Sequence, residues 1–213
     1  MDEIRIVTKI EELDKRRSKV YINQEFAFVL YKGEIVRYRL KNEKAIEDST
    51  YQTIRIEVLP KRAKKRCLNL LQKKPYTEYK LREKLMEGFY TQDVIDDAIN
   101  YVKSFHYVDD YDYACQYIFY HKERESRRKM EEKLIQKGIS KDVLKQAFED
   151  SYEEGEQQEN EFLQARKLLE KKKYNTESAD WKERQKIYAL LVRKGIGNSV
   201  IRQVMEMEQW EDV

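Results

Sequence analysis

The sequence reads KLREKLMEGFYTQDVIDDAINYV at residues 80–102, RRKMEEKLIQKGISKDVLKQAF at 127–148 and KERQKIYALLVRKGIGNSVIRQVM at 182–205. We interpret these stretches as three copies of one pattern, with Tyr90, Ile139 and Ile196 at equivalent positions, 49 and 57 residues apart. Self-similarity at a spacing of several tens of residues is typical of repeat proteins, in which each copy is one supersecondary unit.

Within each copy, apolar residues recur at spacings that place them on one face of a helix. The aligned sets are Leu81, Met130 and Ile187; Leu85, Leu134 and Leu191; Val94, Val143 and Val200; Ile95, Leu144 and Ile201; and Ala98, Ala147 and Val204. A glycine between the two halves, Gly88, Gly138 or Gly195, predicts a left-handed helix C-cap. Each copy therefore predicts a helix, a tight turn and a second helix.

A further amphipathic segment precedes each copy, at residues 62–71, 111–120 and 162–169, which makes three helices per unit. We predict a mainly α fold of three tandem three-helix, helix-turn-helix-like repeats in an elongated array. The predicted boundaries are residues 58–107, 108–157 and 158–213.

Residues 1–57 differ from the rest and predict a β-rich extension with a short helix. The segments FAFVLY (26–31) and EIVRYRL (34–40), separated by Lys32-Gly33, predict two antiparallel strands joined by a two-residue turn. Asp48, Ser49 and Thr50 are expected to cap a helix that runs through Ile56, and Pro60 fits the first turn of the next helix.

Composition favours long solvated helices over a sheet-rich enzyme, because 39% of residues are charged and the chain has only 6 Gly and 2 Pro. The net charge is only +3, but it is unevenly distributed. Basic runs stand at 61–66 (KRAKKR) and 166–173 (RKLLEKKK), whereas residues 146–165 contain seven acidic and no basic residues. No leader or membrane span is apparent, so we expect a cytoplasmic location.

No arrangement of residues predicts catalysis, a metal or a cofactor. Cys67 and Cys115 are far apart and belong to no CxxC pattern, so both are expected to be reduced and part-buried. Asp109, Asp110 and Asp112 are interpreted as helix-capping residues, since no fourth ligand follows at EF-hand spacing. His106 and His121 lack the partners of a nucleophilic site, and the chain has no P-loop.

The basic clusters are the best candidates for a binding surface, although a solvated helix face is the alternative for each cluster taken alone. Lys80, Lys129 and Lys186 occupy the same position in all three copies, which favours function. The tyrosines are interpreted as core residues with surface hydroxyls, and base stacking is the alternative. The candidate binding residues are Lys61, Arg62, Lys64, Lys65, Arg66, Lys80, Arg124, Arg127, Arg128, Lys129, Lys171, Lys172, Lys173 and Lys186.

The three copies, together with the linker VDDYDYA at 108–114, resemble the RecX family over roughly residues 58–207. The chain departs from the family pattern at Glu125-Ser126, where members often have glycine. The resemblance implies a non-catalytic regulator that binds the RecA–DNA filament, lies in its groove, and restrains its recombinase and co-protease activities. It leaves open whether the filament is capped, blocked or destabilised.

Two other classes remain as rivals. A free-standing helix-turn-helix DNA-binding protein is the main alternative, but a chain that relies on phosphate contacts alone would be more basic and would lack the acidic stretch. An enzyme is the third class, and it has no candidate residues. We expect a monomer whose partners are the RecA filament and, weakly or through the filament, single- or double-stranded DNA, and no membrane.

Overall fold

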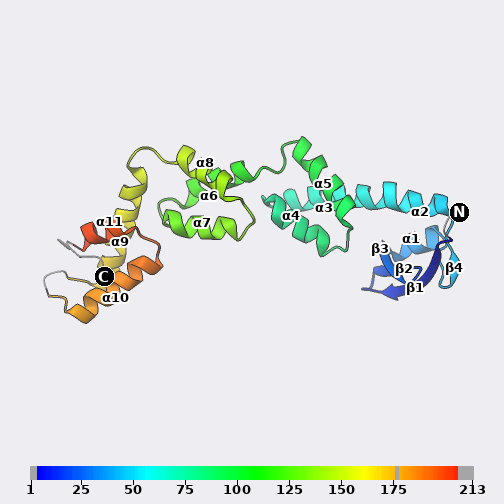
Figure 1. Ribbon diagram of the computed structural model, residues 1–213, viewed down its shortest axis with the longest axis horizontal. Coiled ribbons are helices and arrows are strands. Elements are labelled where there is room, and N and C mark those ends of the chain that lie inside the picture. Colours follow the sequence, from blue (N-terminus) through cyan, green and yellow to red (C-terminus); the bar gives the residue numbers. More distant parts are fainter. Residues whose placement is uncertain (1–3, 176–177, 206–213) are drawn as a thin grey trace. The chain divides into compact units, whose positions relative to one another are not determined.

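The computed structural model describes residues 4–175 and 178–205, and the chain forms two compact units, residues 1–109 and 110–213. The first unit contains β1 (Ile6–Glu12), β2 (Arg17–Ile22), β3 (Glu25–Tyr31), α1 (Lys32–Arg37), β4 (Lys44–Ala45), α2 (Asp48–Gln52), the π-helical segment η1 (Thr53–Val58), α3 (Leu59–Leu71), α4 (Glu78–Met86) and α5 (Gln92–Ser104). The second contains α6 (Asp110–His121), α7 (Arg127–Ile135), α8 (Lys141–Ser151), α9 (Glu156–Lys172), α10 (Trp181–Arg193) and α11 (Asn198–Val204) (Figure 1).

The N-terminal strands form an antiparallel sheet with the order β3-β2-β1-β4. Strands β2 and β3 are joined by Asn23 and Gln24, which both have positive φ angles, 49° and 72°. Two successive residues of this conformation match the right-handed twist of a hairpin. One face of the sheet is buried through side chains such as Val20 and Phe28, and this face contributes to the core of the first unit.

The predicted strand at residues 34–40 is wrong, because the chain turns into helix α1 directly after β3. The Glu34 carboxylate accepts the Tyr31 backbone N–H at 2.7 Å, which favours a helix start at this point. Ile35 and Tyr38, three residues apart, pack against the core, while Val36 between them is 76% exposed. The true partner of β3 is β2, whose turn lies before β3 rather than after it.

The short helix predicted after residue 47 and the helix predicted at Pro60 are one continuous helical stretch from Asp48 to Leu71. Pro60 has no N–H to donate to the turn before it, and the helix adopts the wider π conformation over the six residues that end at Val58. Buried residues along this stretch, including Ile54, Ala63 and Cys67, join the sheet to α5 in one hydrophobic cluster. Figure 1 shows the sheet beside this long helix.

The threefold helical repeat is confirmed, since each copy is a three-helix unit: α3–α5, α6–α8 and α9–α11. Leu85, Leu134 and Leu191, which occupy equivalent positions, are all 0% exposed, and each lies in a different hydrophobic cluster. The other aligned apolar residues are also buried or half-buried. The end of the predicted third repeat, residues 206–213, lies outside the described residues.

The predicted glycine C-caps hold in two of the three copies. Gly138 and Gly195 follow their helices with φ angles of 87° and 80°. In the first copy the left-handed residue is Phe89, with a φ of 62°, and not Gly88. Phe89 stands at the position equivalent to Gly138 and Gly195, so the turn geometry is retained although the glycine is displaced by one residue.

Both cysteines are free, and Cys67 is fully buried while Cys115 is half-buried, as predicted. Burial raises the pKa of the Cys67 thiol to about 11. Among the described residues, no helix is long and apolar enough to cross a membrane. No group of three His, Cys, Asp or Glu side chains in residues 4–175 and 178–205 is placed to hold a metal ion.

Candidate functional site

The second unit contains a groove of about 760 Å³ where the second three-helix repeat meets the third. We call it the seam groove. Its walls come from the turn between α6 and α7, from α7 itself, and from α9 and α10. Seven basic and two acidic side chains line it: Arg124, Lys129, Lys133, Lys167, Lys171, Arg193 and Lys194, with Glu123 and Glu125.

Specific polar contacts hold the two sides of the seam groove together. The Ser126 hydroxyl donates a hydrogen bond of 2.7 Å to the Lys194 carbonyl oxygen, and the Gln164 side-chain amide donates one of 3.0 Å to the Lys122 carbonyl oxygen. The Lys122 ammonium also forms an ion pair of 2.6 Å with Glu156, at the start of α9. These bonds join residues that are between 34 and 68 positions apart in the sequence, so the groove is a product of tertiary packing.

Within the described residues, two of the seven cations in the seam groove are paired with carboxylates. Lys129 forms an ion pair of 2.5 Å with Glu132, and Lys133 forms one of 2.5 Å with Glu125. The hydrogen bond that Lys133 donates to Glu125 raises the pKa of Lys133, and the bond that Lys129 donates to Glu132 lowers the pKa of Glu132. The other five, which form no ion pair within the described part of the chain, are Arg124, Lys167, Lys171, Arg193 and Lys194.

Leu168, Leu190 and Ile196 supply apolar surface inside this ring of cations. A concave surface with uncompensated positive charge attracts polyanions and acidic protein surfaces, because its field is focused by the low-dielectric walls. The seam groove can therefore bind phosphate or carboxylate groups by electrostatic attraction and hydrogen bonding.

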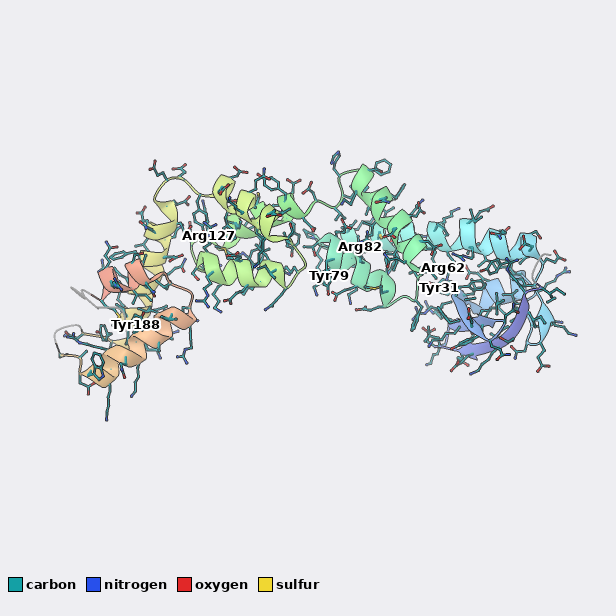
Figure 2. All side chains as sticks on the ribbon, viewed as in Figure 1. Tyr31, Arg62, Tyr79, Arg82, Arg127 and Tyr188 are labelled. Carbon is teal, nitrogen blue, oxygen red and sulfur yellow. The ribbon has the colours of Figure 1, made fainter. Side chains whose placement is uncertain are left out.

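Of the candidates predicted in the second unit, the structure brings Arg124, Lys129 and Lys171 together in the seam groove. Arg127 is used elsewhere: its guanidinium lies 4.8 Å from the centre of the Phe148 ring and donates to the Gln157 side chain at 3.1 Å. Figure 2 labels Arg127 in this unit. The remaining predicted cations lie outside the groove: Arg128, which pairs with Glu132 at 3.3 Å, and Lys172, Lys173 and Lys186, which are exposed.

Sequence reasoning missed Lys133, Lys167, Arg193 and Lys194. For two of these four residues, the sequence did contain an indication. Lys133 follows Lys129 by four residues, and Lys167 precedes Lys171 by four, so each pair lies on one helix face. That α7, α9 and α10 turn these faces toward one groove could not be read from the sequence.

The first unit contains a second basic surface, between the N-terminal sheet and α3. Two hollows of about 450 and 650 Å³ share Tyr31, Arg62, Arg66 and Tyr90 along their common wall, and we call them together the α3 groove. The predicted residues Lys61 and Lys65 also line it. Lys64 and Lys80 are engaged in ion pairs instead: Lys64 of α3 pairs with Asp97 of α5 at 2.9 Å, and Lys80 pairs with Glu83 at 2.7 Å.

Arg62 is largely enclosed, with 16% of its side chain exposed. Its guanidinium lies 3.1 Å from the Glu34 carboxylate, donates to the Val29 carbonyl oxygen at 3.2 Å, and covers the Tyr31 ring at 4.9 Å. Figure 2 shows Arg62 and Tyr31 close together. Arg62 therefore joins α3 to the N-terminal sheet and α1.

Family models describe two of these helical units. A model described as "RecX, first three-helix domain" matches residues 63–101, and one described as "RecX, third three-helix domain" matches residues 159–205.

Curated relatives agree with the family models. "Regulatory protein RecX" of Clostridium botulinum (strain Eklund 17B / Type B) is 26% identical over 202 residues, which cover 94% of each chain. The protein of that name from Clostridium perfringens (strain SM101 / Type A) is 29% identical over 211 residues, 95% of this chain and 97% of the relative. The one from Clostridium acetobutylicum is 32% identical over 124 residues, 57% of this chain and 56% of the relative.

Solved structures agree on the fold. "Crystal structure of regulatory protein RecX" superposes with a TM-score of 0.63 at 21% identity and covers 95% of this chain and 100% of its own. "Crystal structure of RecX from Lactobacillus salivarius" gives a TM-score of 0.61 at 20% identity, over 71% of this chain and 97% of its own. At this level of identity the match concerns the fold alone.

Proposed function

Because the chain belongs to the RecX family of regulatory proteins, we propose that it binds RecA–DNA filaments and lowers their recombinase, ATPase and co-protease activities. The observation on which the proposal rests is the seam groove, where five cations that form no ion pair with any described residue surround an apolar surface. A filament of protein on DNA offers both carboxylates and phosphates to such a groove. In this proposal the protein acts by binding and performs no chemistry of its own.

The repeated architecture supports binding to a polymer. Tandem units joined in one chain can engage neighbouring subunits at once, and the second contact is then favoured by the effective concentration that the first one creates. Modest electrostatic contacts in each repeat can therefore add to a large overall affinity. We place the seam groove among these contacts and leave Arg127 out, because its guanidinium already contacts Phe148 and Gln157.

The proposal is tested with RecA filaments assembled beforehand on circular single-stranded DNA. The purified chain, added in amounts below those of RecA, should lower the rate of ATP hydrolysis and slow strand exchange with a homologous duplex. Unchanged rates, with RecA shown to be active, would contradict the proposal.

The order of addition separates this proposal from a free-standing DNA-binding protein. A protein that only competes for DNA inhibits when it is added before RecA, and it does so only at concentrations high enough to cover the strand. A filament-binding protein also inhibits when it is added after assembly, at amounts too low to cover the DNA.

A further inference from the structure

The α3 groove has more positive charge than its own carboxylates can balance. Within the described residues, the carboxylates of Asp14, Glu34 and Glu87 are each paired with a cation of the groove, namely Arg17, Arg62 and Lys84. The lining cations that form no ion pair there are Arg16, Arg37, Lys61, Lys65 and Arg66. Glu57 is the only remaining carboxylate among the lining residues.

Three of these cations come from α3, and they are spread over two successive turns of that helix. Lys61 and Lys65 lie four residues apart, so they project from successive turns of one helix face, and Arg66 follows next to Lys65. All three side chains belong to exposed residues. Such a row suits a ligand that carries a negative charge at regular intervals.

Aromatic rings stand at the rim of the same groove. Tyr31 is 43% exposed and Phe89 is 37% exposed, and both line it. Each ring has a cation close to it: the Arg62 guanidinium at 4.9 Å from Tyr31, and the Lys19 ammonium at 4.7 Å from Phe89. The rings are therefore supported from one side while part of each remains open to a ligand.

We infer that the α3 groove binds single-stranded nucleic acid, with phosphates on Lys61, Lys65 and Arg66 and bases against Tyr31 and Phe89. Cations that follow a backbone, combined with exposed rings, are the two elements of single-strand recognition. A duplex keeps its bases stacked inside and cannot use the rings, and polyglutamate has no aromatic groups to stack on them. The inference gives the N-terminal sheet a function, and it goes beyond the proposed action on RecA.

The test uses the full chain without RecA, so its outcome is separate from that of the ATPase assay. Binding is measured by fluorescence anisotropy with a labelled oligothymidylate, an abasic strand of the same length and a duplex. The oligothymidylate should bind at least fivefold more tightly than the abasic strand, since one stacked base contributes roughly that factor or more. Equal affinities for the three ligands, or displacement of the oligothymidylate by polyglutamate at equal charge concentration, would overturn the inference.

Neutral variants then locate the contacts. The double variant Lys65→Gln/Arg66→Gln removes two phosphate contacts, which should weaken oligothymidylate binding about 25-fold at 0.1 M salt and reduce the log–log salt slope by about 1.4. Its matched control, Lys41→Gln/Lys73→Gln, removes two exposed lysines of the same unit that do not line the groove, and it should leave both quantities unchanged. Equal behaviour of the two double variants contradicts the inference.

The stacking contact has its own variant. Phe89→Leu keeps an apolar side chain and should weaken binding of the oligothymidylate while leaving the abasic strand unaffected. A strand that carries 4-thiothymidine should crosslink on irradiation to peptides that contain Tyr31 or Phe89. Crosslinks confined to residues 123–196 would place the strand in the seam groove and overturn the assignment to the α3 groove.

Discussion

The Ser126 hydroxyl donates a 2.7 Å hydrogen bond to the Lys194 carbonyl oxygen, which joins the start of α7 to the end of α10. Ser126 precedes α7 as its N-cap, yet its hydroxyl does not cap that helix, whereas Thr77 and Ser140 accept a backbone N–H of the helices they begin. This serine therefore connects two repeats, whereas Thr77 and Ser140 cap the helices that they begin.

Gly195, next to Lys194, is expected to be essential for this junction. Its φ is 80°, and an added Cβ would lie 2.5 Å from the Ser126 hydroxyl oxygen and 3.2 Å from the Arg128 Cβ. Gly195→Ala should lower the free energy of unfolding of the chain by about 1 kcal/mol for the backbone strain, and by about 1–3 kcal/mol more for the clash.

Gly155→Ala is the matched control for this substitution. Gly155 has a similar φ, 82°, but no atom of a described residue lies within 4 Å of its added Cβ, so only the strain should appear. Urea denaturation followed by circular dichroism measures both variants. Equal losses in the two would show that the close contact with Ser126 does not matter.

Arg62 and Glu34 are predicted to stabilise the first unit as a pair. Their side chains are 16% and 24% exposed, so removing one partner leaves the other poorly solvated. Arg62→Ala should cost about 2 kcal/mol, and a double-mutant cycle with Glu34→Gln should give a coupling energy of about 1 kcal/mol. The exposed neighbour Lys61→Ala is the control and should cost less than about 0.5 kcal/mol. A loss in Arg62→Ala no larger than in the control contradicts this role.

The Lys122–Glu156 ion pair predicts a pH dependence of the junction between the second and third repeats. The hydrogen bond from Lys122 holds the pKa of Glu156 below its ordinary value of 4.5. A lowered pKa in the folded state means that the pair stabilises the fold above pH 4.5, and that this stabilisation is lost as the pH falls through the folded-state pKa.

Glu156→Gln should therefore be less stable than the natural chain at pH 7, and the difference should shrink as the pH falls below 4.5. The comparison requires unfolding free energies at several pH values. Glu159→Gln, an exposed residue of the same first turn, controls for the loss of a negative charge near the helix start. A difference that stays constant with pH would argue against the pair.

The helical repeat could be predicted from sequence because its information is local. The spacing of Leu85 and its equivalents defines helix faces, and glycines with positive φ mark two of the three turns. The sheet was harder to predict. Residues 34–40 read as a strand by composition, but Glu34 accepts the Tyr31 N–H and pairs with Arg62, which is 28 positions away. Asn23 and Gln24 form the real turn without the usual glycine.

The candidate site could be predicted only in part, for a related reason. The basic residues of the seam groove belong to helices and turns whose polar surfaces look ordinary when each is read alone. Lys167 and Arg193 line the same groove because two hydrogen bonds join the third repeat to the second. Gln164 of α9 bonds to the Lys122 carbonyl oxygen, and Ser126 bonds to the Lys194 carbonyl oxygen at the end of α10. Arg127 stands in a conspicuous basic run, but its guanidinium lies on Phe148, a contact that no local pattern indicates.

The central claim is that the seam groove carries the regulatory contact with RecA. We predict that the triple variant Lys167→Glu/Lys171→Glu/Arg193→Glu loses most of its inhibition, because charge reversal replaces attraction by repulsion in a concave surface. These residues are exposed and form no ion pair in the described part of the chain, so the fold should be retained. Lys141→Glu/Lys145→Glu, two exposed lysines of α8 outside the groove, is the control.

The most direct measurement is the rate of ATP hydrolysis by preassembled RecA filaments, titrated with the natural chain, the triple variant and the control. We expect the concentration for half-inhibition to rise at least tenfold in the triple variant and to stay within about twofold in the control, with the same helical content in all three. Equal inhibition by all three proteins would contradict the claim.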